Sequence, residues 1–324
     1  MKKILLIATG GTIASKYTQE GLSPQISAEE LLKYIPAARE FCTIDTVQPF
    51  SLDSTNVRAA HWLQLAQLIE KKYEFYDGFV ICHGTDTMAY TAAALSYLIQ
   101  NNRRPIVITG AQKPIDLAIT DARSNLLDSL RFASHDRAHG VSIVFAKKEF
   151  SKSYNAFSSI NYPDIASIHD NKIIFYIDDK DHNTHPLVFY HQMNTNIFLM
   201  KLIPGTDGRI LDTLAASYDG LIIESFGVGG LPNYGNDSFL NALSDWISAG
   251  KLVCMATQVT HEGSDMEVYQ VGKVIKEKFP VLESYDMTLE ASVTKMMWVL
   301  GQTQDIEECR KLFYKTINHD MLFV

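Results

Sequence analysis

The sequence lacks the features that mark secreted, membrane-bound and nucleic-acid-binding proteins. Only four of its 324 residues are cysteine; they lie far apart without any C-x-x-C pair, which favours reduced thiols over a disulfide framework. No apolar run approaches the ~20 residues that a membrane-spanning helix needs. Acidic residues outnumber lysine and arginine by 37 to 29, and the net charge of -8 argues against a phosphate-backbone partner. We therefore expect a cytoplasmic protein that binds neither membranes nor nucleic acid.

Signals for export and for common cofactors are missing too. The opening MKKILLIATGG has a short apolar run without a small-residue cleavage pattern, so we interpret it as a first strand. A dinucleotide fingerprint fails at 227–232, GVGGLP, because Pro232 occupies the place of the third glycine. No phosphate-loop motif occurs. Cys82 and His83 are neighbours on an expected strand and point to opposite faces, so they do not share a metal.

What the chain does contain is the pattern of an α/β protein. The residues are 46% apolar and 20% charged, as in ordinary globular proteins. Short apolar runs alternate with amphipathic stretches, which predicts a parallel sheet with crossover helices. The expected strands are 3–9, 42–50, 78–84, 105–110, 141–146, 197–205, 220–225 and 251–257. The expected helices are 57–73, 88–99, 121–134, 237–250, 267–279, 290–302 and 305–317.

The length and one change of pattern predict two domains. A chain of 324 residues is long enough for two domains that each bury a core. The α/β alternation loosens into a polar, histidine-containing stretch before it resumes near Ile197. We therefore predict an N-terminal α/β domain over 1–184. A linker over 185–196 and a smaller C-terminal α/β domain over 197–324 follow. Ser292 and Lys295 form an S-x-x-K, which we interpret as part of a packed helix because its companion motifs are missing.

Polar residues recur at the carboxyl ends of the predicted strands. In parallel sheets ligands bind beyond these ends, near the point where strand order reverses. The candidates are the turn Gly10–Gly11–Thr12, the group Asp53–Ser54–Thr55, the pair Thr85 and Asp86, the segment TGAQKP, and the pair Lys147 and Lys148. Together they supply a nucleophile, carboxylates and an amine.

Each candidate also has an ordinary structural explanation. Thr12 could cap the segment that follows it, and Asp86 or Thr87 could cap the helix that begins near Met88. Glycines at a strand end permit positive φ. Asp53–Thr55 resembles any polar turn, and paired lysines are more often solvated surface charge. Each signal is weak alone; their recurrence at successive strand ends is what favours an active site.

Taken together, two segments resemble the signatures of a known family. TGGTIA at 9–14 and HGTDTMAYTAAAL at 83–95 are similar to the signature segments of the bacterial L-asparaginases. The likeness continues through DST, PIVITGAQ, SYNAFSSINYP, ESFGVGG and TKMMWVLGQ, hence over essentially the whole chain, and is greatest to the cytoplasmic type I branch. The resemblance implies a larger N-terminal domain over 1–184 that carries the catalytic residues and a smaller C-terminal domain. It also implies a homotetramer built from close dimers, with no cofactor and no metal.

The resemblance also assigns roles to the strand-end residues. It implies that Thr12 attacks the side-chain amide carbon of L-asparagine, forms an acyl-enzyme and releases ammonia. Thr85, Asp86 and a lysine would position and activate a nucleophile, including the water that hydrolyses the ester. Asp86 would also face the α-ammonium of the substrate and Ser54 its α-carboxylate, beside Asp53 and Thr55. Backbone N–H groups beside Thr85 would stabilise the oxyanion.

The sequence departs from the family pattern in two places. Many relatives carry a tyrosine on a flap where this chain has Leu22, and Tyr17 is the available phenol on the same loop. Relatives also have a longer hairpin, containing an arginine, before the catalytic lysine. Here the chain passes directly from Phe145 to Lys147 and Lys148, and counting back from SYNAF selects Lys148.

Two other functions remain compatible with these residues. One is a related amidohydrolase of mixed asparagine and glutamine specificity, or one serving a transamidation partner; the relatives that act on charged transfer RNA carry an extra N-terminal domain, which we do not expect here. The other is an amino-acid-binding protein that keeps the pocket with a weakened relay. Ammonia release from asparagine alone, from both amides or from neither distinguishes the three.

Overall fold

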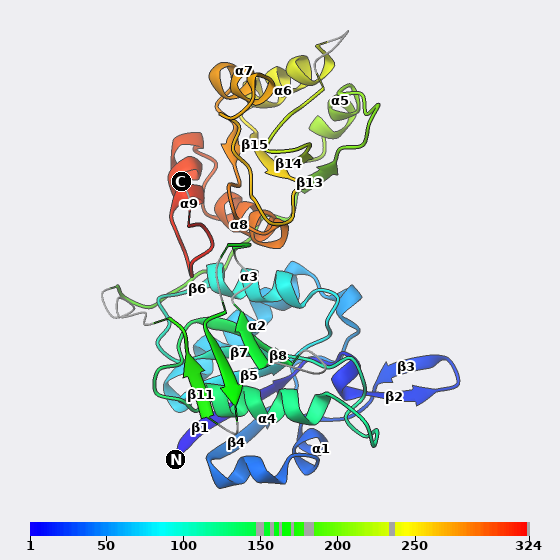
Figure 1. Cartoon of the computed structure of the whole chain (residues 1–324), viewed down its shortest axis with the longest axis vertical. Coiled ribbons are helices and arrows are strands. Elements are labelled where there is room, and N and C mark those ends of the chain that lie inside the picture. The colour runs from blue at the N-terminus through cyan, green and yellow to red at the C-terminus, as the bar shows by residue number, and fades with distance from the viewer. Residues whose placement is uncertain are drawn as a thin grey trace. The chain divides into compact units, whose positions relative to one another are not determined.

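The chain folds into two compact units, each with its own sheet. The structure is a computed structural model that describes residues 1–146, 152–155, 159–161, 164–169, 172–177, 185–232 and 237–322. The first unit comprises Met1–Phe157 and Pro163–His191, and the second comprises Ser158–Tyr162 and Gln192–Val324. A short piece from the first half of the sequence thus belongs to the second unit. Figure 1 shows the two sheets and their helices.

The sheet of the first unit has a parallel part and an antiparallel edge. Its strands lie in the order β11-β10-β9-β8-β7-β5-β1-β4. The parallel strands are β4 (Cys42–Val47), β1 (Lys2–Ala8), β5 (Gly78–Cys82), β7 (Ile106–Thr109) and β8 (Val141–Ala146). The antiparallel strands are β9 (Lys152–Asn155), β10 (Ala166–His169) and β11 (Lys172–Phe175).

The expected parallel strands are confirmed, whereas the antiparallel edge was not predicted. β8 and β9 pair with Ala146 opposite Lys152, so the connection between them is far shorter than the dozen or more residues that a parallel crossover requires. The edge strands are short, and β11 alternates exposed and half-buried residues. A search for long apolar runs does not detect such strands.

Helices cover both faces of this sheet, as Figure 1 shows for α2 and α3 on one face and α1 and α4 on the other. The helices are α1 (Ala28–Lys33), α2 (Ala59–Lys72), α3 (Met88–Leu98) and α4 (Ala122–Ala133). α2 buries one stripe, which includes Trp62, Leu65 and Ile69, the spacing of an amphipathic helix. α3 is buried almost all round, which its small alanine side chains permit.

A β-hairpin follows the first strand where the sequence suggested only a loop. β2 (Ser15–Thr18) and β3 (Gly21–Pro24) pair in an antiparallel ladder and extend away from the sheet in Figure 1. Tyr17 lies directly opposite Leu22, and their exposed fractions are 69% and 43%. Side chains opposite each other share one face of a ladder. Tyr17, the candidate phenol, is therefore a neighbour of Leu22, which occupies the position of the flap tyrosine in many relatives.

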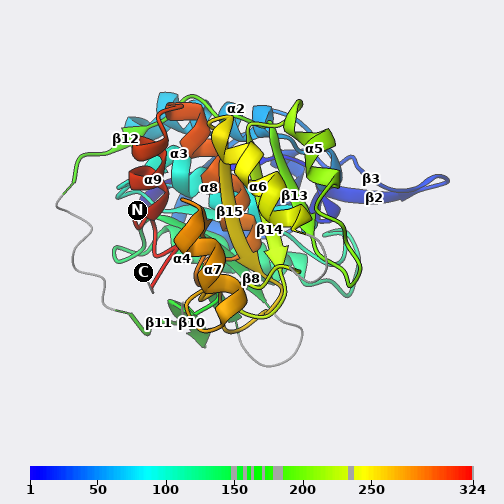
Figure 2. The ribbon, with the colours of Figure 1, turned by 90° about the horizontal axis from the view of Figure 1, so that it is seen from above.

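The second unit is a smaller parallel α/β unit. Its sheet has the order β13 (Ile197–Lys201), β14 (Gly220–Ser225), β15 (Leu252–Thr257) and β16 (Leu282–Glu283). Its helices are α5 (Ile210–Ala215), α6 (Ser238–Ser248), α7 (Gln270–Lys278), α8 (Leu289–Gln302) and α9 (Ile306–Tyr314). Figures 1 and 2 show α6 and α7 over one face of the sheet and α8 against the other. The pattern of strands and helices predicted for this region is confirmed, with α5 and β16 added.

The S-x-x-K of α8 is part of the core, as predicted. Ser292 and Lys295 are both fully buried. The Lys295 ammonium lies 2.6 Å from a carboxylate oxygen of Asp320, which is also fully buried, and donates to the carbonyl oxygen of Lys315 at 2.8 Å. Burial lowers the pKa of Lys295, while Asp320 acts in the opposite direction. The pair ties the C-terminal segment to α8.

Replacing Lys295 with methionine should lower the free energy of unfolding by about 3–5 kcal/mol, because Asp320 would then be a buried charge without its cation. Denaturant unfolding measures the loss. The double variant Lys295→Met with Asp320→Leu removes both charges and should recover much of it. A single variant within about 1 kcal/mol of the parent would show that the pair contributes little.

Candidate active site

Glycine at the end of β1 brings three strand ends together. Gly10 and Gly11 have φ of 104° and 75°, a region that favours glycine. A Cβ atom on Gly10 would lie 2.3 Å from the carbonyl oxygen of Leu52, and one on Gly11 would lie 2.3 Å from the backbone nitrogen of Gly84. No other residue fits there without moving the backbone. Thr12, which follows directly, is half-buried and opens a short 3-10 helix, Thr12–Ala14.

The segment after β4 presents one buried hydroxyl. The Asp53 carboxylate accepts the backbone N–H of Thr55 at 2.9 Å and its hydroxyl at 2.8 Å. Asp53 and Thr55 are exposed and bond to each other, whereas Ser54 between them is 2% exposed. Asp53 therefore shapes the turn, and Ser54 is the residue that the turn directs inward.

Ser54 meets the loop after β5. Its hydroxyl lies 3.2 Å from a carboxylate oxygen of Asp86, to which it donates, and it also lies 3.2 Å from the Asp86 backbone nitrogen. The Thr87 hydroxyl donates to the Ser54 carbonyl oxygen at 2.8 Å. Thr87 is the residue before α3, and its side chain makes no hydrogen bond to the helix. The side chains of Asp86 and Thr87 both bond to Ser54, so neither serves only as a helix cap.

Thr85 lies between these contacts and the end of β7. It is half-buried, and a Cβ atom on Gly110 would lie 3.5 Å from its Cγ2. The loop that begins at Gly110 is held by α4, because Asn125 donates to the Gly110 carbonyl oxygen at 2.9 Å. The Asp121 carboxylate accepts the backbone N–H of Gln112 at 2.9 Å. These bonds hold the backbone of the TGAQKP segment in one conformation beside Thr85.

The remaining predicted site residues are the lysine and the phenol. Lys147 and Lys148 lie outside the described residues, between β8 and β9. Tyr17 stands on the exposed hairpin, on the chain that leads directly from Thr12. Among the described residues no group of three metal-binding side chains occurs. Every helix in those same ranges is too short or too polar to cross a bilayer.

Sequence reasoning missed a buried hydrogen-bond chain behind Gly84. The Trp62 indole donates to the Thr91 hydroxyl at 2.9 Å, and that hydroxyl lies 2.9 Å from His83 Nε2. His83 Nδ1 lies 2.7 Å from the Gly84 carbonyl oxygen. A carbonyl only accepts, so Nδ1 carries the hydrogen and Nε2 accepts from Thr91. Burial lowers the pKa of His83, which agrees with a neutral ring.

The stability of the fold should depend on the protonation of His83. The unfolded chain binds this proton near pH 6.5, and the folded chain binds it only at lower pH because burial lowers the pKa. The contribution of the neutral His83 ring to the free energy of unfolding is therefore complete above about pH 6.5. It is lost as pH falls through the pKa of His83 in the folded protein. Urea unfolding at about pH 7.5 and about pH 5.5 should show a larger loss for the parent than for His83→Gln. Equal losses would contradict this account.

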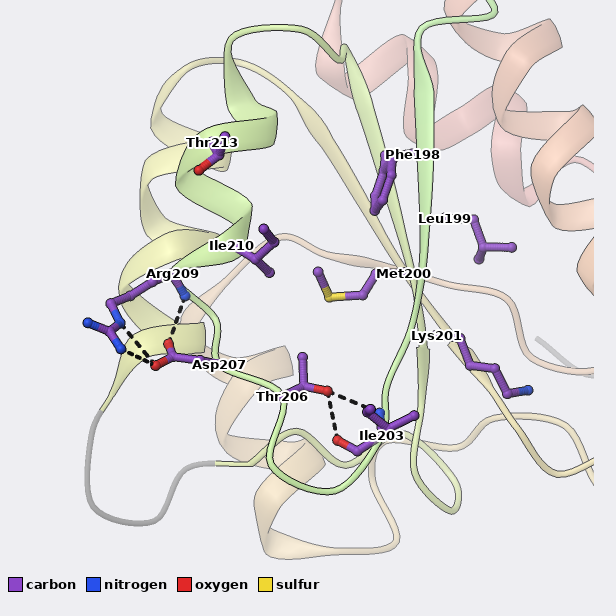
Figure 3. Close-up of a pocket in the computed structure, with 10 residues that line it drawn as sticks. All are labelled: Phe198, Leu199, Met200, Lys201, Ile203, Thr206, Asp207, Arg209, Ile210 and Thr213. Carbon is purple, nitrogen blue, oxygen red and sulfur yellow. Dashed lines mark hydrogen bonds and ion pairs between the residues drawn. The ribbon is translucent and has the colours of Figure 1, made fainter.

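A shallow pocket in the second unit is a rival location for a site. It has a volume of about 710 Å³ and lies between β13 and α5, where Phe198 and Met200 face Ile210 (Figure 3). Asp207 and Arg209 line the pocket and form an ion pair with each other, with 2.7 Å between a guanidinium nitrogen and a carboxylate oxygen. The pocket offers an apolar surface without a hydroxyl beside a free carboxylate, so it lacks the groups that acyl transfer needs.

Comparison with known proteins gives the same family over both units. Residues 3–180 match "Asparaginase, N-terminal" and residues 196–313 match "Glutaminase/Asparaginase C-terminal domain". An L-asparaginase of Thermococcus kodakarensis is 37% identical over 97% of this chain and 98% of its own length. One subunit of the glutamyl-tRNA(Gln) amidotransferase of Pyrococcus abyssi is 32% identical over 96% of this chain and 75% of its own length.

Solved structures agree. The thermostable L-asparaginase from Thermococcus kodakarensis has a TM-score of 0.89 at 32% identity, covering 99% of this chain and 100% of that one. L-asparaginase I from Vibrio cholerae has a TM-score of 0.84 at 25% identity, covering 99% of each chain. The similar proteins thus include an archaeal enzyme as well as a bacterial type I enzyme, so the expected bacterial origin is not established. Both sequence and structure show that the chain belongs to the asparaginase family.

Proposed function

We propose that this protein hydrolyses L-asparagine to L-aspartate and ammonia through an acyl-enzyme on Thr12. The observation that carries the proposal is the meeting of three strand ends at Gly11 and Gly84, with Ser54 bonded to Asp86 beside them. L-Asparagine is a zwitterion, so its site must bind an ammonium group and a carboxylate group at fixed positions. Asp86 supplies charge for the α-ammonium. The Ser54 hydroxyl, whose single hydrogen goes to Asp86 in this structure, would turn that hydrogen to the α-carboxylate when substrate binds.

The proposed reaction has two halves. The Thr12 hydroxyl loses its proton to a base and forms a bond to the amide carbon, and the C–N bond then breaks as the leaving nitrogen takes up a proton, giving ammonia. Water attacks the resulting aspartyl ester, and Thr12 regains its proton as aspartate leaves. We assign the relay of these protons to Thr85, Asp86 and Lys148. The backbone N–H of Thr85 stabilises the oxyanion.

Ammonia release from asparagine and from glutamine tests the function. Turnover of asparagine alone supports the proposal. Comparable turnover of both amides would assign a glutaminase-asparaginase, a candidate favoured by the likeness to amidotransferase subunits, of whose length this chain covers 74–76%. Binding of either amino acid without ammonia release would assign a binding protein.

Asp86→Asn tests how the α-ammonium is recognised. The variant keeps the shape of the side chain and removes its charge, so kcat/KM for asparagine should fall steeply, by roughly 10²-fold or more because a charge-assisted contact is lost. Asp136→Asn, which likewise removes one carboxylate charge but at an exposed residue paired with Lys2 at the start of β1, is the matched control and should stay within a few-fold. Normal kcat/KM in Asp86→Asn would leave Asp86 a structural role only.

Assembly and location complete the proposal. We infer a homodimer or homotetramer from the family resemblance, and a cytoplasmic location from that resemblance together with the scattered cysteines. Sedimentation of the purified protein measures the first.

A further inference from the structure

The hydrogen-bond chain behind Gly84 connects three elements that carry no proposed catalytic side chain. Trp62 comes from α2, Thr91 from α3, and His83 from the end of β5. Thr91 and His83 are fully buried and Trp62 is 6% exposed. Every polar side-chain atom of this hydrogen-bond network has one consistent role. The indole donates to Thr91, Thr91 donates to His83, and His83 donates to Gly84. Buried networks satisfied in this way hold one geometry.

The far end of this chain fixes the orientation of one peptide group. His83 Nδ1 binds the Gly84 carbonyl oxygen at 2.7 Å. A trans peptide is planar, and its C=O and N–H point in opposite directions. The bond therefore turns the backbone N–H of Thr85 away from His83. Gly84 itself has little freedom to tilt, since its backbone packs against Gly11 on one side and against Ser54 on another.

We propose that His83, held by Thr91 and Trp62, is a positioning residue that orients the Gly84–Thr85 peptide so that the Thr85 N–H meets the oxyanion formed during attack by Thr12. This inference rests on the proposed function. It assigns the buried histidine a role in the rate of the reaction, where a core histidine would contribute only to stability. Its action is on the transition state, because an oxyanion donor gains most when negative charge develops.

The variant Thr91→Val tests this with minimal change of volume. It removes the hydroxyl that fixes the His83 ring and leaves Ser54 and Asp86 in place. We expect kcat for asparagine to fall ~10-fold with KM within about 2-fold, since small misplacements of catalytic groups can cost up to ~10²-fold. Thr91→Ser restores a hydroxyl and should keep kcat near the parent value.

Cys82→Ala is the matched control for a purely structural effect. Cys82 precedes His83 on the strand, is fully buried, and belongs to the core on the opposite face of the sheet. The substitution should lower the free energy of unfolding and leave kcat unchanged. If Thr91→Val keeps the parent kcat, or if Cys82→Ala loses kcat to the same extent, the network serves packing alone and the inference is wrong.

Nitrogen NMR of labelled histidine separates this inference from the proposed function. The parent protein should show His83 as the neutral Nδ1–H tautomer, and a proton on Nε2 would overturn the inference whatever the turnover. A parent protein that shows the expected tautomer but releases no ammonia from either amide overturns the proposed function, and the catalytic role of His83 falls with it.

Discussion

Replacing Thr12 with alanine should reduce ammonia release from asparagine by at least ~10⁴-fold, as loss of a covalent nucleophile does in other acyl-transfer enzymes. In the proposed mechanism no acyl-enzyme forms without this hydroxyl, so the second half of the reaction has no substrate. Thr12 opens a 3-10 helix of three residues and is only half-buried. The fold should therefore survive the change. A continuous ammonia assay measures the rate, and the free energy of unfolding checks the fold.

Two further variants make the result specific to the Thr12 oxygen. Thr12→Ser keeps a hydroxyl and should retain measurable turnover, whereas Thr12→Val keeps the shape and should be as inactive as the alanine variant. Ser15→Ala is a control on the same turn, because that hydroxyl is buried and bonded to the Gly11 carbonyl oxygen. An active Thr12→Val would place the nucleophile elsewhere.

Replacing Lys148 with methionine should lower the rate by about 10²–10⁴-fold, roughly 3–5 kcal/mol of barrier, the usual cost of losing a general base. A lysine that acts as a base must be neutral, which requires burial or a nearby positive group. A lysine that acts through its charge needs only Asp86 close by. Both roles predict inactivity, and the pH dependence of kcat/KM distinguishes them.

The neighbouring lysines are the controls for this assignment. Adjacent residues of an extended chain face opposite sides, so from the sequence alone we expect only one of Lys147 and Lys148 to act in catalysis. Lys147→Met and Lys152→Met should stay within a few-fold of the parent. If one of these is the inactive variant, the count from SYNAF selects the wrong lysine. If all three variants stay active, the relay contains no lysine.

The fold could be predicted from sequence where burial is simple. Parallel strands such as 78–82 are apolar throughout because both faces are covered, and α2 shows a helical stripe. The β2–β3 hairpin could not be found this way, since its large apolar residues Tyr17 and Leu22 are exposed and it has no buried apolar face. The antiparallel edge escaped for a related reason, because its strands are short and only partly apolar.

Some features of the candidate site could also be predicted from the sequence, whereas others could not. Residues at strand ends could be gathered from sequence because parallel strands present their carboxyl ends along one edge. The bond between Ser54 and Asp86 and the closeness of Gly11 to Gly84 depend on the course of two loops. The partnership of Trp62 with Thr91 and His83 joins residues on three elements. Only the alternation that turns His83 away from Cys82 hinted at it.

Peptide mapping of enzyme quenched during turnover tests the central claim most directly. Protein mixed with asparagine and denatured in acid should carry an aspartyl ester, and fragmentation should place it on the hydroxyl of Thr12. The ester should be absent from Thr12→Val treated in the same way. An ester found on Thr85, or ammonia release in Thr12→Val at the parent rate, would contradict the account.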